Sequence, residues 1–168
     1  MTLQHVPRRR LSFMEANSMD ANIVIDTGLT GFIMLDRILE VNADRIVGMR
    51  TFTGASADLP LESFAQIGAF HIRYLTGFSR HVFLIKIASC SIPLRIPLEG
   101  EYVLTGTLLS RTDSSFRSSV KAERDKETTA EAELLYAAVD YDHNFQKDIL
   151  HDHYTKAFSC LQRDIKTA

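Results

Sequence analysis

The sequence predicts an α+β fold in which an antiparallel sheet wraps around one long, buried helix. Residues 59–77, LPLESFAQIGAFHIRYLTG, are apolar on more than one side, as expected for a helix enclosed by other elements. Two strand-like segments precede this helix and four follow it. With 168 residues, 45% of them hydrophobic, the chain is long enough for one well-formed core and short for two.

The first two strands are expected at 32–41 and 44–52, FIMLDRILEV and DRIVGMRTF, because both segments are rich in β-branched and aromatic residues. Asn42 and Ala43 separate them, which predicts a hairpin or one long bent pair of strands. The next segment, TGASAD at 53–58, consists of turn-forming residues.

The central helix is expected to begin near Asp58 to Pro60 and to end near Gly77. Asp is a good N-cap, proline suits the first turn, and glycine adopts the left-handed conformation that ends many helices. Glu62 lies close to the helix start, where the positive end of the dipole stabilises a carboxylate. Because this stabilisation alone explains an acid there, a catalytic role for Glu62 needs separate support.

Four further strands are expected after the helix, since strand-like segments alternate there with turn residues. The alternation is clearest in SFRSSVKAER, where Phe116 and Val120 share one face. Residues 130–139 contain enough Ala and Glu to be scored as helix, but the surrounding pattern favours a strand. The expected strands are 81–89, 101–111, 115–124 and 128–140.

The C-terminal part predicts an amphipathic helix that packs on the body of the protein or on a partner subunit, because apolar residues recur at steps of mostly three or four. These residues are Phe145, Ile149, Tyr154, Phe158, Leu161 and Ile165. The expected organisation is a flexible leader at 1–20, an α+β domain at 21–142 and this helix at 143–168. A sheet around one helix leaves an edge uncovered, which dimerisation would close.

Composition excludes several functions. The formal charge of −2 argues against nucleic acid as a partner, and the arginines at 8–10 are best explained as a solubilising tail. No stretch approaches the ~20 apolar residues of a membrane span. Two cysteines outside any CxxC arrangement indicate a reducing cytoplasm. Neither a metal nor a cofactor is expected, and His151 and His153, two residues apart on a helix, point away from each other.

Three short motifs occur in a matching order: LDRI at 35–38, the pair Glu62 and Gln66 within LESFAQ, and a later strand entered through Pro97 and Gly100. Over roughly residues 30 to 140 the chain resembles the 3-hydroxyacyl-ACP dehydratases. The resemblance implies the hotdog fold, in which two protomers form one continuous sheet and acyl tunnels lie at their interface. It also implies acyl-ACP or acyl-CoA as a partner and a homodimer, with higher oligomers left open.

The resemblance assigns the catalytic carboxylate to Glu62 and substrate-binding positions to Gln66, Phe83 and Leu59. Gln66 would orient Glu62 or satisfy buried backbone at the subunit interface. In the family, a histidine from the preceding loop removes the α-proton of the thioester, and the acid protonates the departing hydroxyl. Here the loop reads MRTFTGASADLPLES and contains no histidine, so the family's usual base is missing from its position.

His81 is the candidate replacement for this base, either within the chain or from a second subunit. His71 is excluded as a direct partner, since it lies two and a half turns and about 13 Å along the helix from Glu62. Cys90 is expected to be a small buried hydrophobe. An acidic carrier protein would require a basic rim near the tunnel, for which four residues are candidates. They are Arg73, Arg80, Lys86 and Arg95.

Three functions therefore stay open. The first is a divergent 3-hydroxyacyl-ACP dehydratase of fatty acid or related lipid biosynthesis, acting through Glu62. The second is a dimer that binds an acyl carrier, or supports an active dehydratase, without catalysis. The third is an acyl thioesterase in which a single carboxylate activates water and no histidine is needed.

Overall fold

The computed structural model describes residues 33–55, 58–92 and 98–162; the expected leader at 1–20 lies outside them. It contains the predicted hairpin, central helix, four further strands and C-terminal helix. In chain order the elements are β1 (Arg37–Val41), β2 (Arg45–Ala55), α1 (Asp58–Leu75), β3 (Arg80–Ser91), β4 (Leu98–Arg111), β5 (Ser115–Arg124), β6 (Glu127–Asp140) and α2 (Lys147–Gln162).

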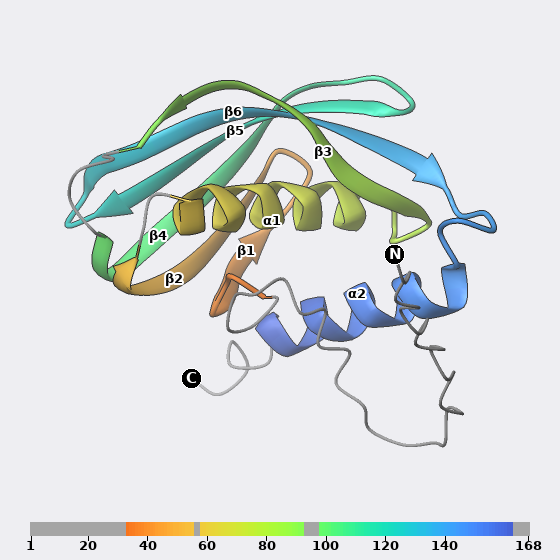
Figure 1. Ribbon diagram of the computed structural model, residues 1–168, viewed down its shortest axis with the longest axis horizontal. Helices are drawn as coiled ribbons and strands as arrows, with labels where there is room; N and C mark the ends of the chain where they lie inside the picture. The colour runs from red at the N-terminus through yellow and green to blue at the C-terminus, as the bar shows by residue number, and fades with distance from the viewer. Residues whose placement is uncertain (1–32, 56–57, 93–97, 163–168) are drawn as a thin grey trace, which may run out of the picture. The chain divides into compact units, whose positions relative to one another are not determined.

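The six strands form one antiparallel sheet in the order β1-β2-β4-β5-β6-β3. The sheet curves around α1, which lies along its concave face (Figure 1). This confirms the predicted α+β class with a sheet wrapped around one helix. Residues 130–139 lie within β6, so the strand interpretation of this Ala- and Glu-containing segment is confirmed.

The core lies between α1 and the concave face of the sheet. Phe64, Ile67 and Ile72 of α1 are fully buried. They pack against inward-facing residues of the strands, among them Ile46, Leu104, Val120, Leu134 and Tyr136. Burying each such side chain contributes about 1.5 to 3 kcal/mol, so this layer accounts for much of the stability.

The C-terminal end of α1 follows from the local sequence. Beyond the last turn, Gly77 has a φ of 58°, the left-handed conformation expected for a residue that ends a helix.

The start of β1 is held by Asp36. Before β1, the carboxylate of Asp36 accepts hydrogen bonds from Arg50 Nη1 (2.8 Å) and from the backbone N–H of Thr51 (2.6 Å). The LDRI motif therefore holds the start of β1 against β2.

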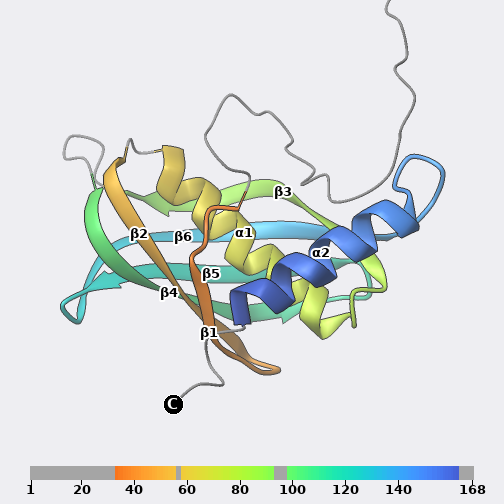
Figure 2. The same ribbon diagram turned by 90° about the horizontal axis from the view of Figure 1, so that it is seen from below.

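α2 covers the side of α1 that faces away from the sheet and crosses its C-terminal half (Figure 2). Phe158 is the centre of this contact, with its ring 5.9 Å from Phe70 and 5.3 Å from Phe78. Ile149 was expected on the buried face but is 50% exposed, because it lies in the first turn of α2, before the helix reaches α1. The expected boundaries after residues 20 and 142 stay predictions.

Candidate functional site

The candidate site lies at the N-terminal end of α1, where Glu62 and Gln66 occupy one face of the helix, one turn apart. Both side chains are half-buried. The Gln66 Nε2 donates a hydrogen bond of 2.8 Å to Glu62 Oε1. Among the described residues, no donor is found for the second carboxylate oxygen, Oε2. Glu62 therefore has one oxygen that Gln66 holds and one to which no described residue donates.

Gln66 is held in turn by the segment that enters β1. The backbone N–H of Met34 donates to Gln66 Oε1 at 2.8 Å, although the two residues are far apart in the sequence. Only the oxygen of an amide accepts such a bond, so its nitrogen must face Glu62. The structure brings together the expected pair, Glu62 and Gln66, and adds Met34 to it.

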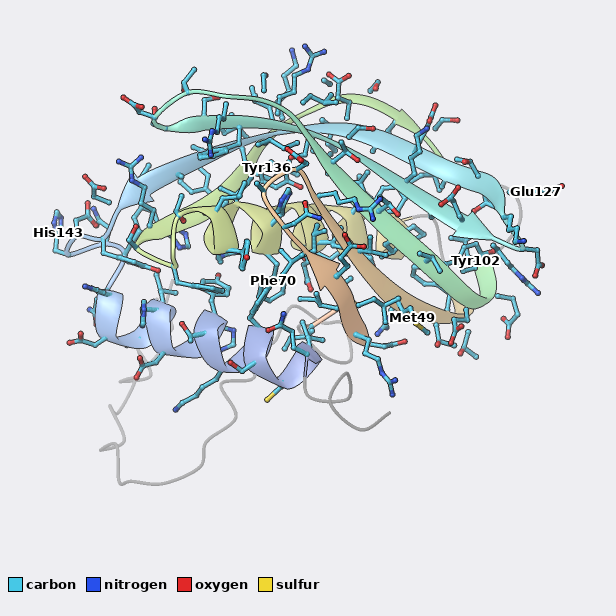
Figure 3. All side chains as sticks on the ribbon, turned by 180° about the vertical axis from the view of Figure 1, so that it is seen from behind. Met49, Phe70, Tyr102, Glu127, Tyr136 and His143 are labelled. Carbon is cyan, nitrogen blue, oxygen red and sulfur yellow. The ribbon has the colours of Figure 1, made fainter. Side chains whose placement is uncertain are left out.

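Tyr136 fixes the position of α1 on the sheet. Its side chain lies between β6 and α1 (Figure 3), and its hydroxyl donates to the carbonyl oxygens of Phe64 (3.3 Å) and Ala65 (3.1 Å). A Cβ at Gly68 would lie 2.2 Å from this hydroxyl, so only glycine fits there. Burial raises the pKa of the Tyr136 phenol, which keeps the proton that these bonds require. The helix that carries Glu62 is thereby locked to β6.

His81 lies elsewhere in the chain. Its ring stacks on Phe145 at 4.4 Å, next to Tyr154 of α2, and burial lowers its pKa, with Arg73 adding to the effect. Arg73 donates to the carbonyl oxygen of the neighbouring Val82 at 2.7 Å. His81 therefore lies near Arg73, which is eleven residues after Glu62 and about 16 Å further along the helix. The structure does not bring His81 to Glu62 within one chain. A role for His81 from a second subunit stays untested.

The remaining residues that the sequence singled out have other surroundings. Phe83 is 39% exposed on β3, with its ring 6.1 Å from Phe145. Leu59 lies in the first turn of α1, and its side chain is outside the described part of the structure. Cys90 is exposed rather than buried, because β3 is an edge strand. His71 is fully buried, and its Nε2 donates to the carbonyl oxygen of Asn42 at 2.9 Å.

Sequence reasoning missed the role of Arg73. It was one of four candidates for a basic rim, but only 5% of it is exposed, and its guanidinium lies 3.6 Å from the centre of the Tyr154 ring. Phe70 lies on the same side, between α1 and α2 (Figure 3). The spacing of Phe70 and Arg73 on one helix face, together with the aromatic residues of α2, was the available signal. Arg73 is thus a packing residue that is not accessible to a carrier protein.

The remaining basic candidates differ in their surroundings. Arg80 donates to the carbonyl oxygen of Asp113 and lies 3.4 Å from an oxygen of Asp140. Lys86 is exposed on β3, and Arg95 lies outside the described residues. The structure describes no group of three His, Cys, Asp or Glu side chains suited to a metal ion, and no helix in its described part is long and apolar enough to cross a membrane.

Known proteins share this architecture at low sequence identity. A thioesterase from Haemophilus influenzae aligns with a TM-score of 0.55 and 12% identity over 63% of this chain and 80% of its own. A mutant thioesterase from Pseudomonas aeruginosa gives 0.54 and 10%, over 62% and 81%. A dehydratase heterocomplex from Xenorhabdus doucetiae gives 0.53 and 11%, over 68% and 86%. No protein-family model and no curated protein matches the sequence.

These neighbours establish the fold. Together with the six-stranded antiparallel sheet around α1, they show that the chain has the hotdog fold. Among the neighbours are hotdog proteins that act on thioesters as thioesterases, and one that is a dehydratase. Identities of 10 to 12% carry the fold and leave the reaction to be inferred from the site itself.

Proposed function

We propose that this protein is an acyl thioesterase in which the Glu62 carboxylate activates water. The observation that carries the proposal is the arrangement of Glu62 itself: Gln66 holds Oε1, and no donor occupies Oε2 among the described residues. No histidine of the described chain hydrogen bonds to this carboxylate. In hydrolysis one carboxylate can take a proton from water and later return it to the thiolate, whereas the dehydratases that the sequence resembles use a histidine as base besides the acid. A lone carboxylate suits the first reaction.

In the proposed reaction, a water molecule hydrogen bonds to Glu62 Oε2 and attacks the thioester carbonyl carbon. Glu62 takes one proton from this water as the C–O bond forms. The positive end of the α1 dipole, four residues before Glu62, stabilises the negative charge on the carbonyl oxygen. The C–S bond then breaks, and Glu62 returns the proton to the departing thiolate. The products are a carboxylic acid and a free thiol.

A second copy of the chain is proposed to complete the acyl site. β3 is an edge strand of the described sheet and exposes three large apolar side chains, Phe83, Ile85 and Ile87. Pairing β3 with its symmetry mate would cover these side chains and the unpaired backbone groups of the edge. Acyl-CoA and acyl-ACP both carry the required thioester. The cytoplasm stays the predicted compartment, on the basis of two free cysteines.

Dehydration of 3-hydroxyacyl-ACP is the second candidate. The resemblance of the LDRI and LESFAQ segments and the dehydratase among the structural neighbours favour it. This reaction would need a base that Glu62 does not find in its own chain, and His81 of a second subunit is the candidate from the sequence. A dimer that binds the acyl carrier without reacting is the outcome expected if neither reaction occurs.

The test compares three proteins: wild type, Glu62→Gln and the control Glu127→Gln. Glu127 is exposed at the start of β6 and makes no contribution to the proposed site. Release of free thiol from acyl-CoA substrates of several lengths is followed over time. Glu62→Gln should lower kcat by about a hundredfold or more, while the control variant retains wild-type turnover. Equal turnover by all three proteins would remove Glu62 from the mechanism.

A further inference from the structure

The orientation of the Gln66 amide depends on the chain that enters β1. A backbone N–H pairs only with the oxygen of a glutamine amide, and Met34 provides such an N–H at 2.8 Å from Gln66 Oε1. If the amide turned over, its NH₂ group would face the Met34 N–H and its oxygen would face the Glu62 carboxylate. Both contacts would then be repulsive. Met34 therefore ensures that Gln66 offers a donor to Glu62.

The Met34 N–H is itself a fixed donor. The side chains of Met34 and Leu35 are only 4% and 3% exposed. Arg50 Nη2 lies 3.8 Å from the Met34 sulfur, and the same guanidinium binds the Asp36 carboxylate. The Asp36 N–H donates to the Met49 carbonyl oxygen at 2.9 Å. Residues 33–36 are thus anchored on both the helix side and the β2 side.

We propose that the Met34 backbone amide is a positioning group for the reaction at Glu62. It acts through Gln66: it fixes the amide, the amide fixes Glu62 Oε1, and Oε2 is left in a constant direction for water. The inference rests on the proposed function in that Glu62 is taken as the base. Displacing residues 33–36 from α1 would release Gln66 and slow the chemical step.

Two substitutions separate the two hydrogen bonds. Met34→Pro removes the N–H donor, and Met34→Leu is the matched control that keeps it. Gln66→Glu keeps an oxygen that accepts from Met34 but loses the donor to Glu62. Met34→Pro and Gln66→Glu should each lower kcat by about tenfold or more and change KM less than twofold. The double variant should be no slower than Gln66→Glu alone, because both changes break the same path.

An NMR measurement tests the same path without any substrate. The side-chain amide resonances of Gln66 are identified by their absence from the Gln66→Glu spectrum. Met34→Pro should shift them and speed their exchange with solvent, and Met34→Leu should leave them at the wild-type values. If Met34→Pro does not fold, Asp36→Ala takes its place, since it frees the segment from Arg50 and Thr51. The same resonances should then move.

The outcomes are distinguishable. Unchanged Gln66 resonances in the Met34→Pro or Asp36→Ala protein would overturn the positioning role, whatever the enzyme hydrolyses. Shifted resonances with an unchanged kcat would overturn it as well. Shifted resonances in a protein whose wild type hydrolyses no thioester would refute the proposed function, and with it the part of the inference that concerns catalysis.

Discussion

At the N-terminal end of α1, two half-buried polar side chains face each other and one carboxylate oxygen has no donor in the described structure. At the C-terminal end, Arg73 and Phe70 are buried under the aromatic side chains of α2. The same helix thus carries a half-buried polar pair at one end and a closed, tightly packed contact at the other. Stability and chemistry should therefore respond to substitutions at different ends of α1.

The largest effect on stability is expected at Phe158. Phe158→Ala removes a ring that packs on Phe70, Tyr74 and Phe78 and leaves a cavity. The free energy of unfolding should therefore fall by about 3 to 5 kcal/mol. Urea denaturation followed by circular dichroism measures the change. Ile149→Ala on the same helix is the control, with a change below about 1 kcal/mol because that side chain is half exposed. Equal losses for the two variants would mean that α2 does not dock through Phe158.

The contact through which Tyr136 of β6 holds α1 is tested at Gly68. A methyl group at this position overlaps the hydroxyl of Tyr136, which is fully buried and hydrogen bonded to the carbonyl oxygens of Phe64 and Ala65. Gly68→Ala should lower the free energy of unfolding by about 2 to 3 kcal/mol. Gly77→Ala is the control: nothing lies within 4 Å of its added Cβ, and only the left-handed backbone opposes it, at about 1 to 2 kcal/mol. A Gly68→Ala protein as stable as wild type would place Tyr136 elsewhere.

The free energy of unfolding should fall on acidification, because His71, His81 and His153 have lowered pKa values in the folded protein. Burial lowers the pKa of His71, whereas in the unfolded chain the pKa is about 6.5. The folded state therefore keeps His71 neutral while the unfolded state takes up a proton. The stability that results from keeping His71 neutral is complete above pH about 6.5. As the pH falls below that value, the free energy of unfolding decreases by at most about 1.4 kcal/mol per pH unit.

Urea denaturation between pH 7.5 and 5 measures this slope. His71→Gln should reduce it, because the substituted side chain binds no proton in either state. Identical slopes for wild type and His71→Gln would contradict the account of His71. His81 and His153 have pKa values lowered in the same direction, by burial and by Arg73, and act with the same sign.

Local patterns predicted most of the fold. The apolar helix, its glycine end, the hairpin and the alternating strands each depend on neighbouring residues, and all are present. The pairing of Glu62 with Gln66 was also predictable, since residues four apart lie on one helix face. Contacts between distant segments were not: Met34 with Gln66, and Arg73 with Tyr154, depend on how β1 and α2 fold back on α1. The burial of Arg73 and the exposure of Cys90 were misjudged for the same reason.

The most direct test of the central claim is mass spectrometry of the products formed from acyl-CoA and 3-hydroxyacyl-ACP in water enriched in ¹⁸O. Hydrolysis through Glu62 predicts a free fatty acid with one ¹⁸O atom in its carboxylate, and no such product from Glu62→Gln. Loss of water from 3-hydroxyacyl-ACP with the thioester intact would contradict the thioesterase account and favour dehydration. Unchanged substrates in both reactions would contradict catalysis at Glu62 altogether.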